Sequence, residues 1–250
     1  MHVRFRLLLS CMGFLVTDQA LDAVLLIGAP GTQDRNTAPG GELTSIGFPD
    51  DRFYNVGNRG VFIGTYGGSH WVLSARHVGA GNTTFTDPDT LTANTYAFVN
   101  GSDVTLMNAD ATEADLVLYR IASAPTNLGN LPIRSTTPSL LSTAVMIGDG
   151  RDREANRTYW DDATDPWTEV TSGDPWDRNG WKWESTGGTV RWGLNDVAAT
   201  GTDVTVSGRT VTTFTTVFGF AAGETNWTDE AQGAVGDSGG AVFLYNGSAW

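Results

Sequence analysis

One short segment near the end of the chain combines a potential nucleophile with unusual backbone freedom. Residues 236–240 read Gly-Asp-Ser-Gly-Gly, and the apolar run 241–245 follows them. Glycines on both sides of Ser238 permit a tight turn in which the amides of Gly236 and Ser238 point into one small space. Two such donors stabilise the charge that develops on a carbonyl oxygen under nucleophilic attack. The segment therefore predicts Ser238 as a nucleophile beside an oxyanion hole formed by Gly236 and Ser238.

A serine hydroxyl is a poor nucleophile at neutral pH and needs a general base within hydrogen-bond reach. Histidine is the usual base, and the chain offers His2, His70 and His77. His2 belongs to the N-terminal leader considered below, and His70 sits in a Gly-rich turn where a solvated role is expected. His77 follows an apolar segment, 71–75, and comes just before a glycine. We therefore expect His77 to be the base.

The third group of such a site orients the base, and Asp115 is the candidate for it. Asp115 stands at the head of the apolar run 116–121, where a buried carboxylate must find a donor. His77 would be that donor. Asp103 and Asp110 compete for the role, but neither heads an apolar run as cleanly. A solvated aspartate at a strand end is the alternative interpretation of Asp115.

These segments resemble the histidine, aspartate and serine blocks of the chymotrypsin family of serine proteases. The histidine block reads Trp-Val-Leu-Ser-Ala-Arg-His-Val-Gly over residues 71–79, and the aspartate block reads Ala-Asp-Leu-Val-Leu-Tyr-Arg-Ile over residues 114–121. The order His77, Asp115, Ser238 is also that of the family. The resemblance implies that His77 takes the Ser238 proton and later gives it to the leaving amine, while Asp115 fixes the imidazole tautomer.

The sequence departs from the family in the substrate pocket and in activation. Gln232, six positions before the nucleophile, stands where the resemblance places the floor of the specificity pocket, with Gly233 and Val235 in its wall. A trypsin-like preference would need an acid at that floor. The family's activation motif is absent, although an amine exposed at Val24 would be able to pair with Asp237.

Charge and composition exclude several functions. The 250 residues carry a formal net charge of −13, from 15 Lys and Arg against 28 Asp and Glu. This balance argues against nucleic acid or an anionic membrane surface as a partner. No ligand spacing typical of a calcium loop occurs, so we expect no metal and no cofactor. The expected partner is a protein or peptide substrate.

The N-terminus has the layout of a secretory signal peptide over residues 1–23. Its apolar run, 7–16, is too short to span a bilayer permanently, and a buried N-terminal helix or strand is the alternative. The single cysteine, Cys11, lies in this run, so the processed chain would hold no thiol. We therefore expect a secreted or periplasmic protein.

Helix formers are sparse after the leader, while glycine (31 in all), threonine, valine and aromatic residues are plentiful. This composition predicts an all-β fold, with short strands in two groups that form two barrels or one sandwich. The resemblance implies two antiparallel six-stranded barrels of the chymotrypsin fold. We expect an extended lead-in over 24–51, an N-terminal barrel over 52–137 with His77 and Asp115, and a C-terminal barrel over 138–250 with Ser238.

Two features of the C-terminal half stand outside that pattern. The sequence stops soon after a hairpin-turn signal at Asn246, so we expect the second barrel to be incomplete. Residues 149–188 form an insertion rich in Trp and Asp, which suits a self-packed surface loop beside the cleft or, less well, a calcium or sugar site. The sequence favours a secreted serine endopeptidase. The alternative is a non-catalytic protease-like module that binds peptide or glycan through this insertion.

Overall fold

The protein is described here by a computed structural model, which confirms the prediction of an all-β class. Most of the regular secondary structure is β-strand, and the helices found in the described part are two segments of five residues each. Within the same residues, no helix is long and apolar enough to cross a membrane. The leader over 1–23 lies outside the described residues, which are 24–26, 35–161, 163, 165–171, 178–218, 228–246 and 250.

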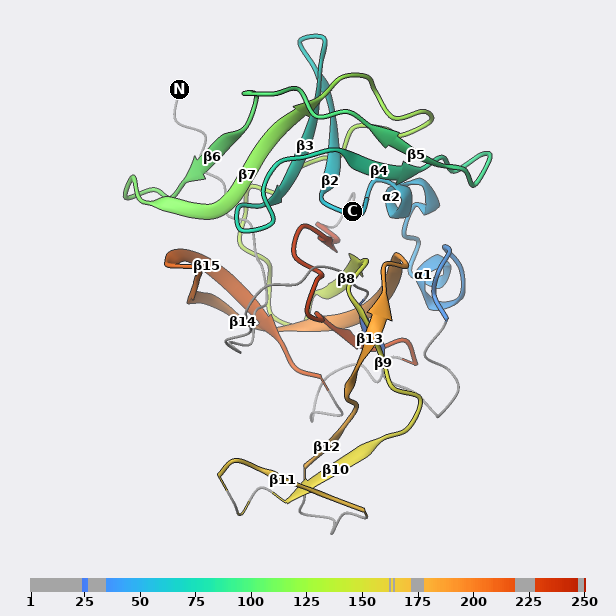
Figure 1. Cartoon of the computed structure of the whole chain (residues 1–250), viewed down its shortest axis with the longest axis vertical. Coiled ribbons are helices and arrows are strands. Elements are labelled where there is room, and N and C mark those ends of the chain that lie inside the picture. The colour runs from blue at the N-terminus through green and yellow to red at the C-terminus, as the bar shows by residue number, and fades with distance from the viewer. Residues whose placement is uncertain are drawn as a thin grey trace.

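The first half of the chain forms a four-stranded antiparallel sheet in the order β2-β3-β7-β6 and a separate β4-β5 hairpin (Figure 1). Alternating apolar residues from β2, β3 and β7 pack against Phe85 of β4 to form one core. Short strands rich in β-branched and aromatic residues suit such a half-buried surface. The strands are β2 (Val61–Tyr66), β3 (Ser69–Ala75), β4 (Thr83–Thr86), β5 (Ala93–Tyr96), β6 (Val104–Met107) and β7 (Glu113–Ile121).

The second half builds another four-stranded antiparallel sheet, in the order β15-β14-β8-β17, with a short β1-β16 ribbon beside it. The ladders seen in the described residues are open sheets, so the two barrels, the second of them incomplete, stay a prediction. Ser207 and Gly208, both at positive φ, make the tight β14-β15 turn. The strands are β1 (Leu25–Leu26), β8 (Thr143–Gly148), β14 (Arg191–Val206), β15 (Arg209–Thr216), β16 (Ala231–Gln232) and β17 (Ala241–Leu244).

The segment expected to be an extended lead-in, 24–51, instead contains helix α1 (Gly41–Ser45) and the start of helix α2 (Asp50–Tyr54). These helices were missed because a five-residue element is too short to show helical periodicity. Leu43 and Phe53 are buried in a cluster that also contains residues of β2, β8, β14 and β17. The helices therefore join the two halves through a shared apolar core.

The long β14-β15 hairpin also connects the halves. Its β15 strand places Val211 against Ala114 and Leu116 of β7 in a small buried cluster. Close to its tip, an Arg209 Nη2 lies 2.8 Å from a Glu113 carboxylate oxygen. These contacts attach the hairpin to the first residues of β7, the strand that contains Asp115.

The insertion over 149–188 is an arm with its own strands, and Figure 1 shows it projecting away from the two main sheets. Its proximal part is a ribbon of β9 (Arg151–Arg153) and β13 (Trp183–Gly187), and its distal part is a sheet in the order β11-β10-β12. The Trp181 ring contacts two guanidinium groups, with its centroid 4.7 Å from Arg153 Cζ and 5.1 Å from Arg157 Cζ. The distal strands are β10 (Thr158–Asp161), β11 (Thr168–Val170) and β12 (Arg178–Gly180).

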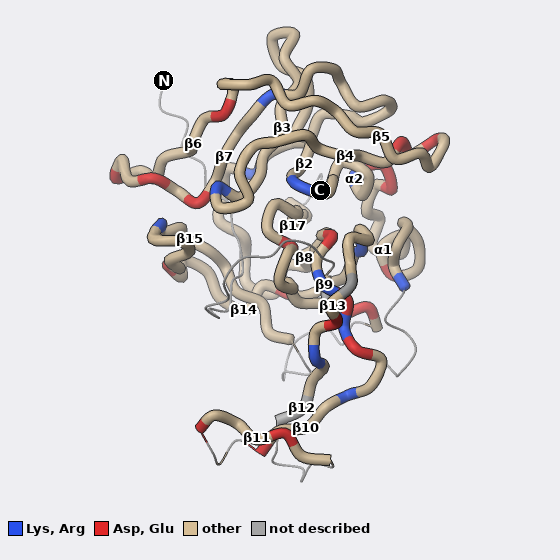
Figure 2. The backbone as a smooth tube through the Cα atoms, in the orientation of Figure 1, with Lys and Arg blue, Asp and Glu red and all other residues tan. Residues whose placement is uncertain are grey.

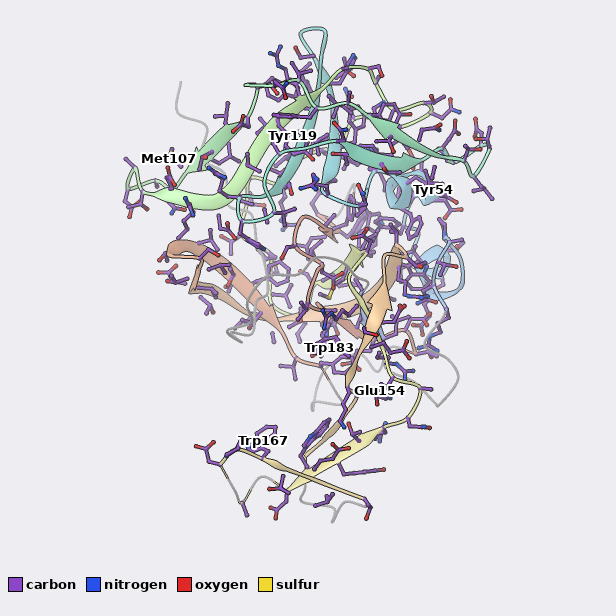
Figure 3. The ribbon with its side chains drawn as sticks, in the orientation of Figure 1. Tyr54, Met107, Tyr119, Glu154, Trp167 and Trp183 are labelled. Carbon is purple, nitrogen blue, oxygen red and sulfur yellow. The ribbon has the colours of Figure 1, made fainter. Side chains whose placement is uncertain are left out.

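The core between the halves predicts unequal roles for two tryptophans. Trp192 is 2% exposed within the shared core, whereas Trp167 on the arm is 57% exposed and lies far from that core (Figure 3). Trp192→Ala is expected to lower the free energy of unfolding by about 3–5 kcal/mol, through lost burial and a cavity. Trp167→Ala is expected to change it by less than about 0.5 kcal/mol. Urea unfolding measures both, and equal losses would contradict this account of the core.

Candidate active site

The structure brings together the three side chains that the sequence singled out. His77 Nε2 lies 2.7 Å from Ser238 Oγ, and His77 Nδ1 lies 2.5 Å from Asp115 Oδ2. The residues come from separate places, since His77 follows β3, Asp115 lies in β7 and Ser238 precedes β17. The site therefore forms only when the two halves of the chain are packed together.

Asp115 holds both the backbone and the ring of His77. Its side chain is 1% exposed, and its Oδ1 accepts the His77 backbone N–H at 3.0 Å. An ionised carboxylate only accepts hydrogen bonds, so His77 Nδ1 must donate to it. In the neutral imidazole this leaves the lone pair on Nε2, facing the Ser238 hydroxyl. The arrangement can therefore accept a proton from Ser238.

The competing residues lie elsewhere. His70 is in β3, where its Nδ1 lies 2.8 Å from Thr65 Oγ1. The Asp110 carboxylate accepts the hydroxyl and the backbone N–H of Thr112, and these bonds lower its pKa. Asp103 is exposed to solvent. Of the candidates that the structure describes, His77 contacts Ser238 and Asp115 contacts His77.

Ser238 lies in a turn over residues 234–240, the nucleophile turn, whose glycines adopt the conformations that the sequence suggested. Gly236 has φ of 98° and Gly239 has φ of 95°, values that favour glycine. The Asp237 N–H donates to Ala234 O at 3.1 Å, and the Gly240 N–H donates to Asp237 O at 2.8 Å. Within the described part of the chain, the amides of Gly236 and Ser238 donate to no protein acceptor. Both amides are available to a substrate oxygen.

The carboxylate of Asp237 accepts two hydrogen bonds that hold this turn. Its Oδ2 accepts the Ala234 N–H at 2.5 Å, and its Oδ1 accepts the Gly150 N–H at 2.9 Å. Charge-assisted bonds of this kind are stronger than neutral ones. Val24, whose freed amine is the possible partner of Asp237, is 5% exposed. It directly precedes β1, and continuing the β1-β16 register places it opposite Gly233. Main-chain donors from two segments therefore fix the turn.

The expected pocket wall begins in β16, where Gln232 pairs with Leu25. Gly233 and Val235 continue it toward the nucleophile, with Gly233 exposed and Val235 partly buried. Asn195 of β14, which sequence reasoning missed, fixes the start of this wall. Its buried amide donates to Ala231 O at 2.8 Å and to Val217 O at 3.0 Å.

Arg59 is a second residue that the sequence did not reveal. Its Nη1 donates to Val78 O at 3.1 Å, directly after His77. Its own carbonyl oxygen accepts the hydroxyl of Ser74 and lies where a Cβ on Gly239 would be. Arg59 therefore contacts both the histidine loop and the nucleophile turn, and no sequence signal marks it because the contacts are long-range.

A polar clamp holds the segment that leads into the pocket wall. Glu42 of α1 accepts the backbone N–H of Thr228 at 3.1 Å and that of Asp229 at 2.9 Å. Arg35 Nε lies 3.2 Å from Asp229 Oδ1. Burial raises the pKa of Asp229 above its ordinary value, although Asn36 and Arg35 oppose the shift.

Comparison with known proteins adds no relative to this picture. No protein-family model matches the chain, and no curated protein sequence matches it. Among the described residues, no group of three His, Cys, Asp or Glu side chains could hold a metal ion. The functional interpretation therefore rests on the geometry around Ser238 and on the sequence blocks.

Gly239 gives a test of the packing at the nucleophile turn. A Cβ at Gly239 would meet the Arg59 backbone and lie 2.9 Å from Ser74 Oγ, whereas one at Gly208 would meet open space. Both positions have positive φ, so alanine at either is expected to cost about 1–2 kcal/mol of strain. Gly239→Ala is expected to cost more than Gly208→Ala in urea unfolding. Equal costs would contradict the contact.

Asp229 predicts a pH dependence of stability. Because burial raises its folded-state pKa, folding favours the protonated form. The resulting stabilisation is present below the unfolded pKa of about 4 and is lost as pH rises through the folded pKa. The stability of the wild type relative to Asp229→Asn should therefore fall from pH 4 upward and then level off. Urea unfolding between pH 4 and 7 measures this difference, with the exposed Asp51→Asn as control. A difference that rises with pH would contradict the shift.

Proposed function

We propose that this protein is a serine endopeptidase that cleaves peptide bonds through an acyl-enzyme. The observation that carries the proposal is the continuous hydrogen-bonded chain from Ser238 Oγ through His77 to the buried Asp115. A hydroxyl, a base within 2.7 Å and a carboxylate that orients the base are the parts that nucleophilic catalysis requires. The class of reaction follows from this site. The resemblance of three sequence blocks to the chymotrypsin family favours a peptide substrate.

In the first half-reaction, Ser238 Oγ attacks the carbonyl carbon of the scissile bond while His77 Nε2 takes the hydroxyl proton. The ring then carries a positive charge, which the Asp115 carboxylate stabilises from the Nδ1 side. The amides of Gly236 and Ser238 are free to donate to the oxygen that becomes negative. When the carbon–nitrogen bond breaks, the proton on Nε2 passes to the leaving amine.

The second half-reaction repeats these steps with water. His77 Nε2 accepts a proton from the water as its oxygen attacks the Ser238 ester carbon. The ester bond then breaks, and the proton returns to Ser238 Oγ. Each step moves one proton through Nε2, so the ring must stay in the orientation that Asp115 imposes through its ring and backbone bonds.

The architecture supports a fold of the chymotrypsin type, with His77 and Asp115 in one half and Ser238 in the other. Each half contains a four-stranded sheet and a two-stranded ribbon, which supports one barrel in each half. The proposed enzyme is exported by its N-terminal leader and acts outside the cytoplasm. Its pocket wall from Gln232 to Val235 carries no charged side chain, which favours substrates other than those with Arg or Lys at the cleaved position.

The alternative, a non-catalytic module that binds peptide or glycan through the insertion, would be favoured by a histidine that cannot reach the serine. The distance of 2.7 Å between His77 Nε2 and Ser238 Oγ favours the catalytic function instead.

An active-site-directed fluorophosphonate tests the proposed nucleophile. We expect it to label Ser238 in the wild-type protein and to fail on Ser238→Ala and His77→Ala, because phosphonylation needs both the hydroxyl and the base. Mass spectrometry of the tryptic peptides locates the label. His70→Ala is the matched control and should be labelled at the wild-type rate, since His70 bonds to Thr65 and lies outside the site. Labelling that survives in Ser238→Ala and His77→Ala would disprove the triad.

Hydrolysis of peptide libraries tests the reaction itself. The wild type should cleave internal peptide bonds, and Asp115→Asn should lower kcat by about four orders of magnitude, because an amide in that place favours the wrong tautomer of His77. Mass spectrometry of the products identifies the cleaved bonds. An unchanged kcat in Asp115→Asn would contradict the role of Asp115.

A further inference from the structure

We propose that the root of the insertion, residues 149–152, is a positioning element that aims the Gly236 amide into the oxyanion hole. This inference rests on the proposed function and adds a part of the chain that the sequence blocks leave out. The carrying observation is a pair of hydrogen bonds that main-chain N–H groups of the root donate to the nucleophile turn. One comes from Gly150 and the other from Arg151.

The Arg151 bond fixes the orientation of one peptide group. The Arg151 N–H donates to Val235 O at 3.1 Å. The peptide between Val235 and Gly236 is trans, so its C=O and N–H point in opposite directions. Holding the Val235 carbonyl toward the root therefore turns the Gly236 N–H away from it, where it meets no protein acceptor in the described residues. If this peptide rotated, the carbonyl would enter the hole and the donor would leave it.

The Gly150 bond fixes the other side of the same turn. The Gly150 N–H donates to Asp237 Oδ1 at 2.9 Å, and the Asp237 carboxylate occupies the space that a Cβ on Gly148 would fill. The peptide group before Gly236 and the side chain of Asp237, the residue after it, are thus held by consecutive residues of the root. A rotation of the Val235–Gly236 peptide must break a bond to the root.

The root is rigid enough to act as this support. The Arg191 side chain is 4% exposed, and its Nε and Nη2 donate to Asp152 Oδ1 at 3.1 and 3.0 Å. Figure 2 shows basic and acidic segments close together along β9 and β13. The Glu154 N–H donates to Lys182 O at 2.8 Å, which closes the ribbon between the root and the distal arm. The root is therefore fixed to β14 independently of the distal strands β10, β11 and β12.

A matched pair of proteins isolates the Arg151 N–H. In one, residue 151 is replaced by lactic acid, which gives an ester with an alanine side chain. In the other, Arg151→Ala keeps the amide, so the two differ only in the N–H group. The ester should react with a fluorophosphonate about 100-fold more slowly than Arg151→Ala, the size expected for loss of one oxyanion donor. Carbethoxylation of His77 by diethyl pyrocarbonate should be equal in both, because it does not use the hole.

Two outcomes with this pair would overturn the inference. Equal fluorophosphonate rates would show that the Arg151 N–H does not aim the donor. Parallel losses in both the phosphonylation and the His77 reaction would show general damage to the site. If the wild type and all variants remain unlabelled, the proposed function itself fails, and this result is distinguishable from the other two.

Shortening the arm tests where the support ends. Residues 155–181 are replaced by an Asn-Gly turn, which closes the ribbon at the Glu154 to Lys182 bond. This protein should unfold cooperatively and react with the fluorophosphonate at the wild-type rate, because the root remains. A cooperatively folded short-arm protein that has lost reactivity would assign the support to the distal strands and overturn the proposal.

Discussion

The hydrogen bond between His77 and Ser238 joins side chains that belong to different halves of the molecule, and it tolerates little movement between them. A shift of one ångström would take Ser238 Oγ out of range of His77 Nε2, which is 2.7 Å away. The interface is accordingly held in several ways. Helices α1 and α2 share one buried cluster with residues of β2, β8, β14 and β17. The β14-β15 hairpin reaches across to β7. Arg59 lies between the histidine loop and the nucleophile turn. Fold and site therefore depend on the same contacts.

Electrostatic order within the site follows from burial. Asp115 lies in β7 with 1% of its side chain exposed, so its charge must be met by nearby donors. His77 supplies two of them, one from its backbone and one from its ring. This double attachment fixes the ring before any substrate arrives. Asp237 has a similar relation to main-chain donors of the turn. Two carboxylates in different environments thus make different contacts, one with the ring of His77 and the other with backbone donors.

The local parts of the site could be predicted from the sequence, but the supports could not. His77, Asp115 and Ser238 stand in short blocks whose residue types already indicate their chemistry, and each block contains an apolar run that predicts a strand. Arg59 and Asn195 look like ordinary polar residues, and their roles come from contacts with segments far away in the chain. Helix α1 is too short for a periodic signal. β14 continues through Gly193, Asn195 and Gly201, whose residue types are typical of turns. Its pairing with β8 and β15 outweighs that local preference.

The arm illustrates how an insertion becomes part of a site. A loop of this length in a compact domain is costly to order unless the chain uses it. Its composition points to the tryptophans as the useful part, yet the contacts with the turn come from main-chain groups at its base. Main-chain donors leave no trace in the residue types, so only the three-dimensional arrangement reveals them. The distal strands β10, β11 and β12 contribute neither of these two hydrogen bonds to the turn. The Arg191–Asp152 ion pair fixes residues 149–152 to β14 without using the distal strands.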